Sequence, residues 1–131
     1  MPIKIRRNKC NDEAALQKAI IRWANYQPIV KDYLHANANG GSRHPFEAKS
    51  LKEQGVRAGV SDLFLPLARG GYHGLYIECK TPKGTGRLSP AQKEWLDLVA
   101  VEGYLGVVVN DFTTATTLIN NYSQGLIERA Q

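Results

Sequence analysis

Residues 61–80 read SDLFLPLARGGYHGLYIECK, and this stretch decides the fold. An apolar run stands at either end, and residues 68–71 between them supply the two glycines that a tight hairpin connection needs. The pattern predicts two antiparallel strands. Because successive side chains of a strand point to opposite faces, Glu78 and Lys80 would project from one face and Cys79 from the other.

Two acidic side chains lie at the open end of this predicted hairpin. Asp62 stands near the start of the first strand, and Glu78 stands near the end of the second. Antiparallel pairing would bring them together, and two such carboxylates repel each other unless a cation lies between them. Mg²⁺ prefers a few carboxylate oxygens, keeps several waters and accepts phosphate oxygens as ligands. We therefore predict a metal site at Asp62 and Glu78, with the backbone carbonyl of Cys79 as a third ligand.

Lys80 would lie beside this site. Its side chain could orient an attacking water or neutralise charge that builds on a phosphate, which together with the metal is what a phosphodiesterase needs. The spacing is loose, however, and an alternative stays open. Glu78 and Lys80 could instead form a weak surface ion pair on a solvated strand face.

The rest of the sequence predicts helices and strands around the hairpin. The expected elements are a helix capped by Asn11 and ending near Pro28, a short strand over 30–35, a helix over 46–54, a helix starting at Ser89 and stopping at Gly103, a strand over 104–109 covered on both faces, and a helix from Asp111 through Tyr122. This order predicts an α/β fold, a mixed sheet flanked by helices.

The start of the fourth predicted helix carries the clearest local signal. Ser89 can cap the helix, Pro90 suits its first position, and Gln92 completes a capping box. The apolar face of this helix would be formed by Trp95, Leu98 and Val99.

Composition bounds the possible functions. The 131 residues predict a single domain, with a basic arm over 1–10 and a frayed tail over 124–131. A net charge of +5 fits a polyanionic partner without proving one. Cys10 and Cys79 lack metal or redox spacing, which predicts free thiols in a reducing compartment. No apolar run approaches the ~18 residues of a membrane span, and no signal peptide is evident, so we expect a cytoplasmic protein.

Four motifs in order resemble the virus-type replication-repair nuclease (VRR-NUC) domain of the PD-(D/E)xK nuclease superfamily. They are Glu13 with Leu16-Gln17, then 59–63, 74–80 and 88–95. The resemblance covers most of the chain, from Glu13 to the last helix, and implies a restriction-endonuclease-like core. Many members have Pro directly before the motif aspartate, where this chain has Ser61. That departure concerns the turn rather than the metal ligand.

The resemblance also implies residue roles and cofactors. Asp62 and Glu78 would be metal ligands, and Lys80 would be the catalytic lysine. Glu13 matches an acidic residue at the family's metal site, and Gln92 matches the glutamine after Ser-Pro. Plainer explanations exist, because an acidic residue is favourable in any first helical turn and Gln92 already completes a capping box. Mg²⁺ is the expected cofactor, Mn²⁺ would substitute for it, and no small-molecule cofactor is expected.

The resemblance implies DNA, branched DNA above all, as the substrate. Small stand-alone members are similar to phage-encoded homodimers that resolve four-way (Holliday) junctions. We therefore expect a homodimeric, structure-selective repair endonuclease in a bacterial or phage-infected cell. One alternative is the same chemistry on flap, single-stranded or duplex DNA. Another is a catalytically idle DNA-binding subunit, and a weaker third is a metal-independent RNA-binding module.

Four basic residues are the expected DNA contacts. Lys83 and Arg87 flank the loop after the predicted catalytic strand, and Arg43 and Arg57 lie in the segment before the motif aspartate. Each could equally be a solubilising surface charge.

Overall fold

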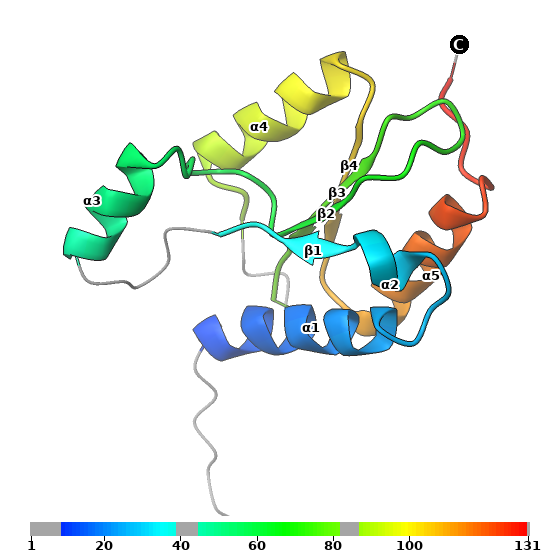
Figure 1. The fold of residues 1–131 in the computed structure, drawn as a ribbon, viewed down its shortest axis with the longest axis horizontal. Helices are drawn as coiled ribbons and strands as arrows, with labels where there is room; N and C mark the ends of the chain where they lie inside the picture. The colour runs from blue at the N-terminus through cyan, green and yellow to red at the C-terminus, as the bar shows by residue number, and fades with distance from the viewer. Residues whose placement is uncertain (1–8, 39–44, 82–86, 131) are drawn as a thin grey trace, which may run out of the picture.

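The computed structural model describes residues 9–38, 45–81 and 87–130, which form a four-stranded sheet flanked by helices (Figure 1). The elements are α1 (Lys9–Ala24), α2 (Val30–Tyr33), β1 (His35–Ala36), α3 (Pro45–Glu53), β2 (Leu63–Leu65), β3 (Leu75–Cys79), α4 (Pro90–Val101), β4 (Leu105–Val109) and α5 (Phe112–Ser123). The sheet order is β1-β2-β3-β4, with β3 and β4 parallel and the other neighbours antiparallel. The predicted hairpin and the mixed α/β class are confirmed.

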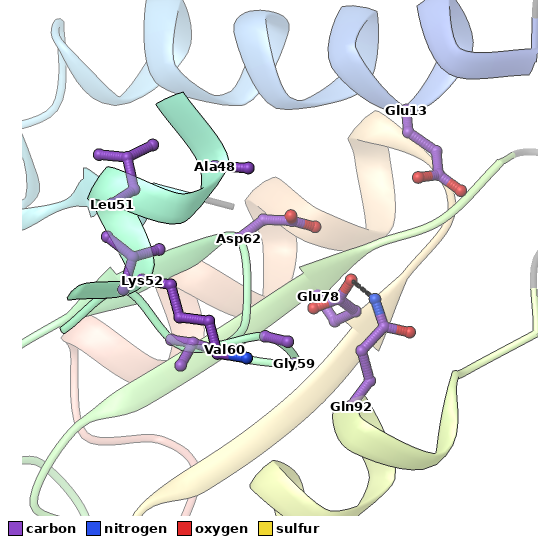
Figure 2. Close-up of a pocket in the computed structure, with 11 residues that line it drawn as sticks. Glu13, Ala48, Leu51, Lys52, Gly59, Val60, Asp62, Glu78 and Gln92 are labelled. Carbon is purple, nitrogen blue, oxygen red and sulfur yellow. Dashed lines mark hydrogen bonds between the residues drawn. The ribbon is translucent and has the colours of Figure 1, made fainter. Parts of the chain in front are cut away.

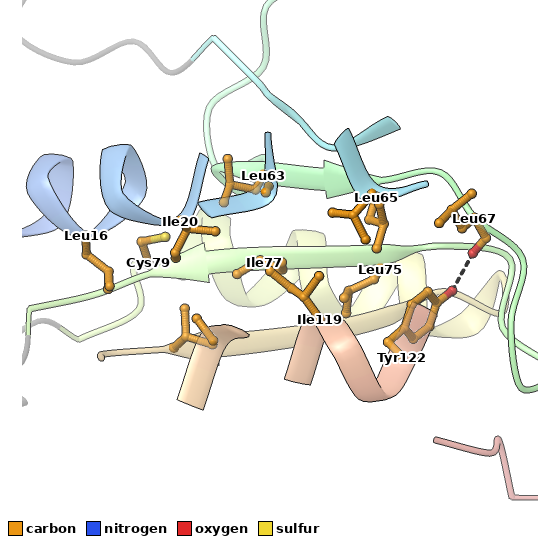
Figure 3. Packing of buried hydrophobic residues seen from close by; sticks show 14 residues of the cluster. Leu16, Ile20, Leu63, Leu65, Leu67, Leu75, Ile77, Cys79, Ile119 and Tyr122 are labelled. Carbon is orange, nitrogen blue, oxygen red and sulfur yellow. Dashed lines mark hydrogen bonds between the residues drawn. The ribbon is translucent and has the colours of Figure 1, made fainter. Parts of the chain in front are cut away.

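The hydrophobic core lies between one face of the sheet and the helices α1 and α5 (Figures 1 and 3). It is built from buried side chains of six elements and the turn after β2, among them Leu16, Ile20, Leu63, Leu65, Leu67, Leu75, Ile77, Cys79, Ile119 and Tyr122. The Tyr122 hydroxyl donates a hydrogen bond to the Leu67 carbonyl at 2.7 Å, which satisfies the polar end of a buried ring. The Leu96 side chain of α4 lies against Gly106 of β4.

Two helices begin at the predicted caps. The Ser89 hydroxyl accepts a hydrogen bond from the Gln92 amide, and the Gln92 side chain accepts one from the Ser89 amide, so the capping box is present. Asp111 caps α5 by accepting from the Thr114 amide at 2.7 Å. These signals were readable because a cap depends on a few neighbouring residues.

Other local predictions are wrong. The first helix begins at Lys9, so Asn11 lies inside α1 instead of capping it. The predicted strand over 30–35 is mostly the helix α2, and only its last residue is in β1. The Val30 amide donates to the Pro28 carbonyl at 2.8 Å, and Ile29 between them has a φ of 71°. This strained γ-turn redirects the chain, and nothing in the local hydrophobic pattern signals it.

Two expectations about burial also fail. β4 is not covered on both faces, because Val108 is 45% exposed. It is also an edge strand of the sheet. Leu98 of α4 is 55% exposed and does not join Val99 in the interior. An apolar run shows that residues tolerate burial, but it does not supply the neighbouring element that would cover them.

The chain ends also differ from expectation. Lys9 and Cys10 of the predicted basic arm belong to α1, while residues 1–8 lie outside the described part of the chain. In the tail, Ile127 packs against the core and the Arg129 amide donates to the Gly70 carbonyl at 2.7 Å, so these two residues contact the rest of the fold. Within the described residues no helix is long and apolar enough to cross a membrane.

Candidate active site

The register of the sheet places the two predicted metal ligands opposite each other. Leu63 pairs with Ile77, so one further step along the same ladder puts Asp62 across from Glu78. Opposite residues of an antiparallel pair have Cβ atoms ~4.5–5.5 Å apart on one face. Asp62 is held by its Oδ2, which accepts a hydrogen bond from the Cys79 amide at 2.8 Å. The predicted meeting of the two carboxylates is therefore a consequence of the hairpin register.

Cys79 presents its backbone and its side chain to different surroundings. The N–H and C=O of one strand residue leave the strand on the same side, so the Cys79 carbonyl is directed to the side on which its amide meets Asp62. The thiol is buried in the core. Burial and the nearby carboxylates raise the pKa of Cys79 to about 12, so the thiol stays protonated. Of the carbonyl and the thiol of this residue, only the carbonyl lies on the side of Asp62.

Glu78 is a buried acid with an unsatisfied oxygen. Its side chain is 3% exposed, and its Oε2 atom is buried without a hydrogen-bond partner. Burial, and then the charge of Asp62, raise the pKa of Glu78 to about 8 against the opposing effect of Lys80. A divalent cation would remove both costs, because it would ligate the orphaned oxygen and neutralise the paired carboxylates. The residues present therefore fit a hard cation that takes oxygen ligands.

The protein side chains alone would not enclose such an ion. In the described residues no group of three His, Cys, Asp or Glu side chains is placed to hold a metal. Two carboxylates and a backbone carbonyl leave positions for water and substrate oxygens, which is the arrangement that Mg²⁺ commonly takes in phosphate chemistry.

Gln92 joins the helix cap to the acidic pair. Its Oε1 atom accepts hydrogen bonds from the Ser89 amide at 2.8 Å and from Lys80 Nζ at 3.0 Å. Its Nε2 atom donates to Glu78 Oε1 at 2.9 Å (Figure 2). Lys80 Nζ lies 3.8 Å from the same Glu78 oxygen. Two donors at Oε1 and an acceptor at Nε2 fix which way the amide points.

A cleft of about 420 Å³ lies beside Glu78 and Gln92 (Figure 2). Asp62, Glu78 and Gln92 line it, and Glu13 reaches it from α1, where its charge contributes to the raised pKa of Glu78. The structure therefore brings Glu13 to the wall of the site. Lys52 of α3 also lines the cleft. The sequence showed Lys52 only as one basic residue among several, because nothing local reveals that α3 lies against the site.

The predicted DNA contacts are only partly placed. Arg57 and Arg87 are exposed, as a phosphate contact must be. Arg43 and Lys83 lie outside the described residues.

The chain is similar to known proteins over the region that forms the candidate site. The VRR-NUC domain family matches residues 11–111, which is most of the chain and includes Glu13, Asp62, Glu78, Lys80 and Gln92. The chain belongs to the VRR-NUC domain family. A solved structure described as a VRR_NUC domain protein is 32% identical to this chain, with a TM-score of 0.74, over 92% of this chain and 93% of that one. No curated protein matches the chain in sequence.

Membership of the VRR-NUC family implies a nuclease-type function. The matched region includes Asp62, Glu78 and Gln92, which line the cleft, and Lys80, which donates a hydrogen bond to Gln92.

The metal-free VRR-NUC domain should lose stability as the pH rises from about 5 to about 8. The pKa of Glu78 is raised from 4.5 to about 8 in the folded protein, so between these values the folded state keeps a proton that the unfolded state has released. The free energy of unfolding then falls with pH by up to about 1.4 kcal/mol per unit. Glu78→Gln should flatten this slope in urea titrations with EDTA.

Glu94→Gln is a matched control, because Glu94 is exposed on α4. Its pH profile should stay parallel to that of wild type. If the Glu78→Gln profile is also parallel to wild type, the assignment of the slope to Glu78 is wrong.

Proposed function

We propose that this VRR-NUC domain is a divalent-metal-dependent DNA endonuclease that hydrolyses phosphodiester bonds. The observation that carries the proposal is the buried, partnerless Oε2 of Glu78, which lies in a cleft shared with Asp62 and is bordered by Lys80. Buried oxygens without a partner are few in native structures, and a divalent cation would ligate this one.

Asp62, Glu78 and the Cys79 carbonyl would hold Mg²⁺, or Mn²⁺ in its place, and the ion would supply Lewis acidity at the phosphate. Lys80 is fixed at its tip by Gln92 and Glu78. A positioned ammonium can donate a hydrogen bond to the attacking water or to a phosphate oxygen that gains charge. Gln92 holds that ammonium and Glu78 in one arrangement, so little reorganisation is needed when the phosphate binds.

We further propose that the substrate is branched DNA and that the enzyme is a homodimer that resolves four-way junctions. The support is the likeness to small stand-alone members of the family. A two-fold dimer would suit paired nicks, because two related active sites would face two related strands. Flap, single-stranded or duplex DNA are the alternative substrates of the same chemistry.

Lys80→Ala should lower cleavage about 100-fold to 1,000-fold, the usual cost of removing a positioned donor in a transition state. The measurement uses a labelled four-way junction beside flap, single-stranded and duplex DNA, with Mg²⁺, Mn²⁺ or EDTA. Symmetric, metal-dependent nicks at the junction would support the resolvase, and cleavage of another DNA would keep the active site and change the substrate.

Lys93→Ala is the control for the loss of one positive charge, since Lys93 is exposed on the same helix as Gln92. It should cleave like wild type. If wild type binds DNA but cuts none of the four substrates, the idle-subunit alternative replaces this proposal.

A further inference from the structure

A second hollow lies beside the cleft. It has a volume of about 320 Å³, and Val56 and Val60 line both spaces. The hollow is further lined by Asn37, Ala38, Gly55, Arg57 and Trp95. It therefore adjoins the cleft in which the phosphate would be cut, and none of the predicted metal ligands lines it.

One described lining residue of the hollow, Trp95, is aromatic, and its ring contacts another ring. The Trp95 ring meets the Tyr76 ring edge-on, with centroids 5.4 Å apart and planes at 89°. Tyr76 in turn stacks on Phe64, with centroids 4.2 Å apart and planes at 4°. A ring held by such contacts offers a rigid surface to a flat apolar group, and little conformational entropy is lost when that group binds.

The polar groups of the hollow indicate what kind of ligand it takes. Among the described residues that line the hollow, Arg57 is the only charged one and none is a carboxylate, in contrast to the acidic cleft beside it. A flat apolar group attached to an anionic backbone matches the Trp95 ring and the Arg57 cation among these lining residues.

We propose that this hollow holds an unpaired nucleobase of the DNA strand whose phosphate lies in the cleft. A base inside a duplex has both faces covered by its neighbours, so only a base that has left the stack could enter. The inference rests on the proposed nuclease function and narrows it, because it favours cutting next to an unpaired or extruded nucleotide over cutting within continuous duplex.

Trp95 itself can report on occupancy. Trp23→Phe leaves Trp95 as the sole tryptophan of the chain, which contains two. This protein is titrated in EDTA with an oligothymidylate single strand and with a blunt duplex of equal length, while the anisotropy of an end label measures the bound fraction. We expect bound single strand to quench Trp95 and bound duplex to leave its emission unchanged.

Filling the hollow should remove this preference. Ala38 is exposed at the rim, so Ala38→Leu adds bulk without disturbing the core. It should weaken single-strand binding about tenfold, in the range for loss of one base stack, and leave duplex binding unchanged. Ala68→Leu, on an equally exposed alanine of the hairpin, is the control for added bulk and should bind both DNAs like wild type. Arg57→Ala is a second variant that removes the rim cation, and it should also weaken single-strand binding.

The outcomes separate this inference from the function on which it rests. Equal quenching by both DNAs, or equal losses in the two leucine variants, would overturn the base site while leaving the nuclease intact. A concentration-dependent change of mass in the absence of DNA, abolished by Ala38→Leu, would assign the hollow to a contact between two copies of the chain and would also overturn it. A wild-type protein that neither binds nor cleaves any DNA would remove the proposed function itself.

Discussion

Asp62→Asn and Glu78→Gln are each expected to lower cleavage at least about 100-fold without weakening the fold. Each change replaces a predicted metal ligand by a neutral amide, and a direct ligand should matter more than the second-shell groups whose loss costs ~10–100-fold. Both changes also relieve the repulsion that raises the pKa of Glu78. Metal-free stability at about pH 8 should therefore equal or exceed that of wild type, because an acid kept charged in a buried site is a cost that function tolerates.

Asp62→Ala separates the ligand role from the structural one. Asparagine retains an oxygen for the Cys79 amide, which now donates to Asp62 at 2.8 Å, whereas alanine leaves that buried donor unsatisfied. The alanine variant should lose about 1–3 kcal/mol of stability in urea denaturation, in addition to its activity. Cleavage within about tenfold of wild type in either amide variant would contradict the metal-ligand assignment.

Gly59→Ala is expected to damage both stability and cleavage. Gly59 has a φ of 89°, and a Cβ atom there would lie 2.5 Å from the backbone C and O atoms of Ala91 in the first turn of α4. The loop before Asp62 would have to move away from α4, and Asp62 follows three residues later. We expect a loss of at least about 2 kcal/mol in urea denaturation and a larger loss of activity than stability alone explains.

Gly55→Ala is the matched control. Gly55 has a φ of 103°, but nothing lies within 4 Å of the position that its Cβ would take. This variant therefore meets the backbone strain without the collision. If the two alanine variants are equally stable and equally active, close approach of the loop to α4 does not position the site.

The central features of the site were predictable because they depend on short stretches of sequence. The hairpin register that sets Asp62 against Glu78 follows from two strands joined by a glycine-containing turn. The cap at Ser89 follows from four consecutive residues. The family resemblance added Glu13, which no local pattern could have tied to residues some fifty positions away.

The features that were missed depend on tertiary contacts, which local sequence patterns do not reveal. Lys52 lines the cleft because of where α3 lies. Val108 is exposed although it lies in an apolar run, and the turn at Ile29 overrides the strand propensity of its flanking residues. In each case tertiary placement prevailed over local preference.

Because of the position of Gln92, the first turn of α4 holds the reactive groups of the candidate site in place. The same side chain completes the cap of α4 and holds both Lys80 and Glu78. Helix ends open more readily than helix centres, and such opening does not require the core to melt. Fraying at Ser89 would therefore break the contacts of Gln92 with Lys80 and Glu78 while the sheet stayed intact. On heating, activity should disappear before the cooperative loss of far-ultraviolet circular dichroism, and coincident transitions would show that the cap opens only with the whole domain.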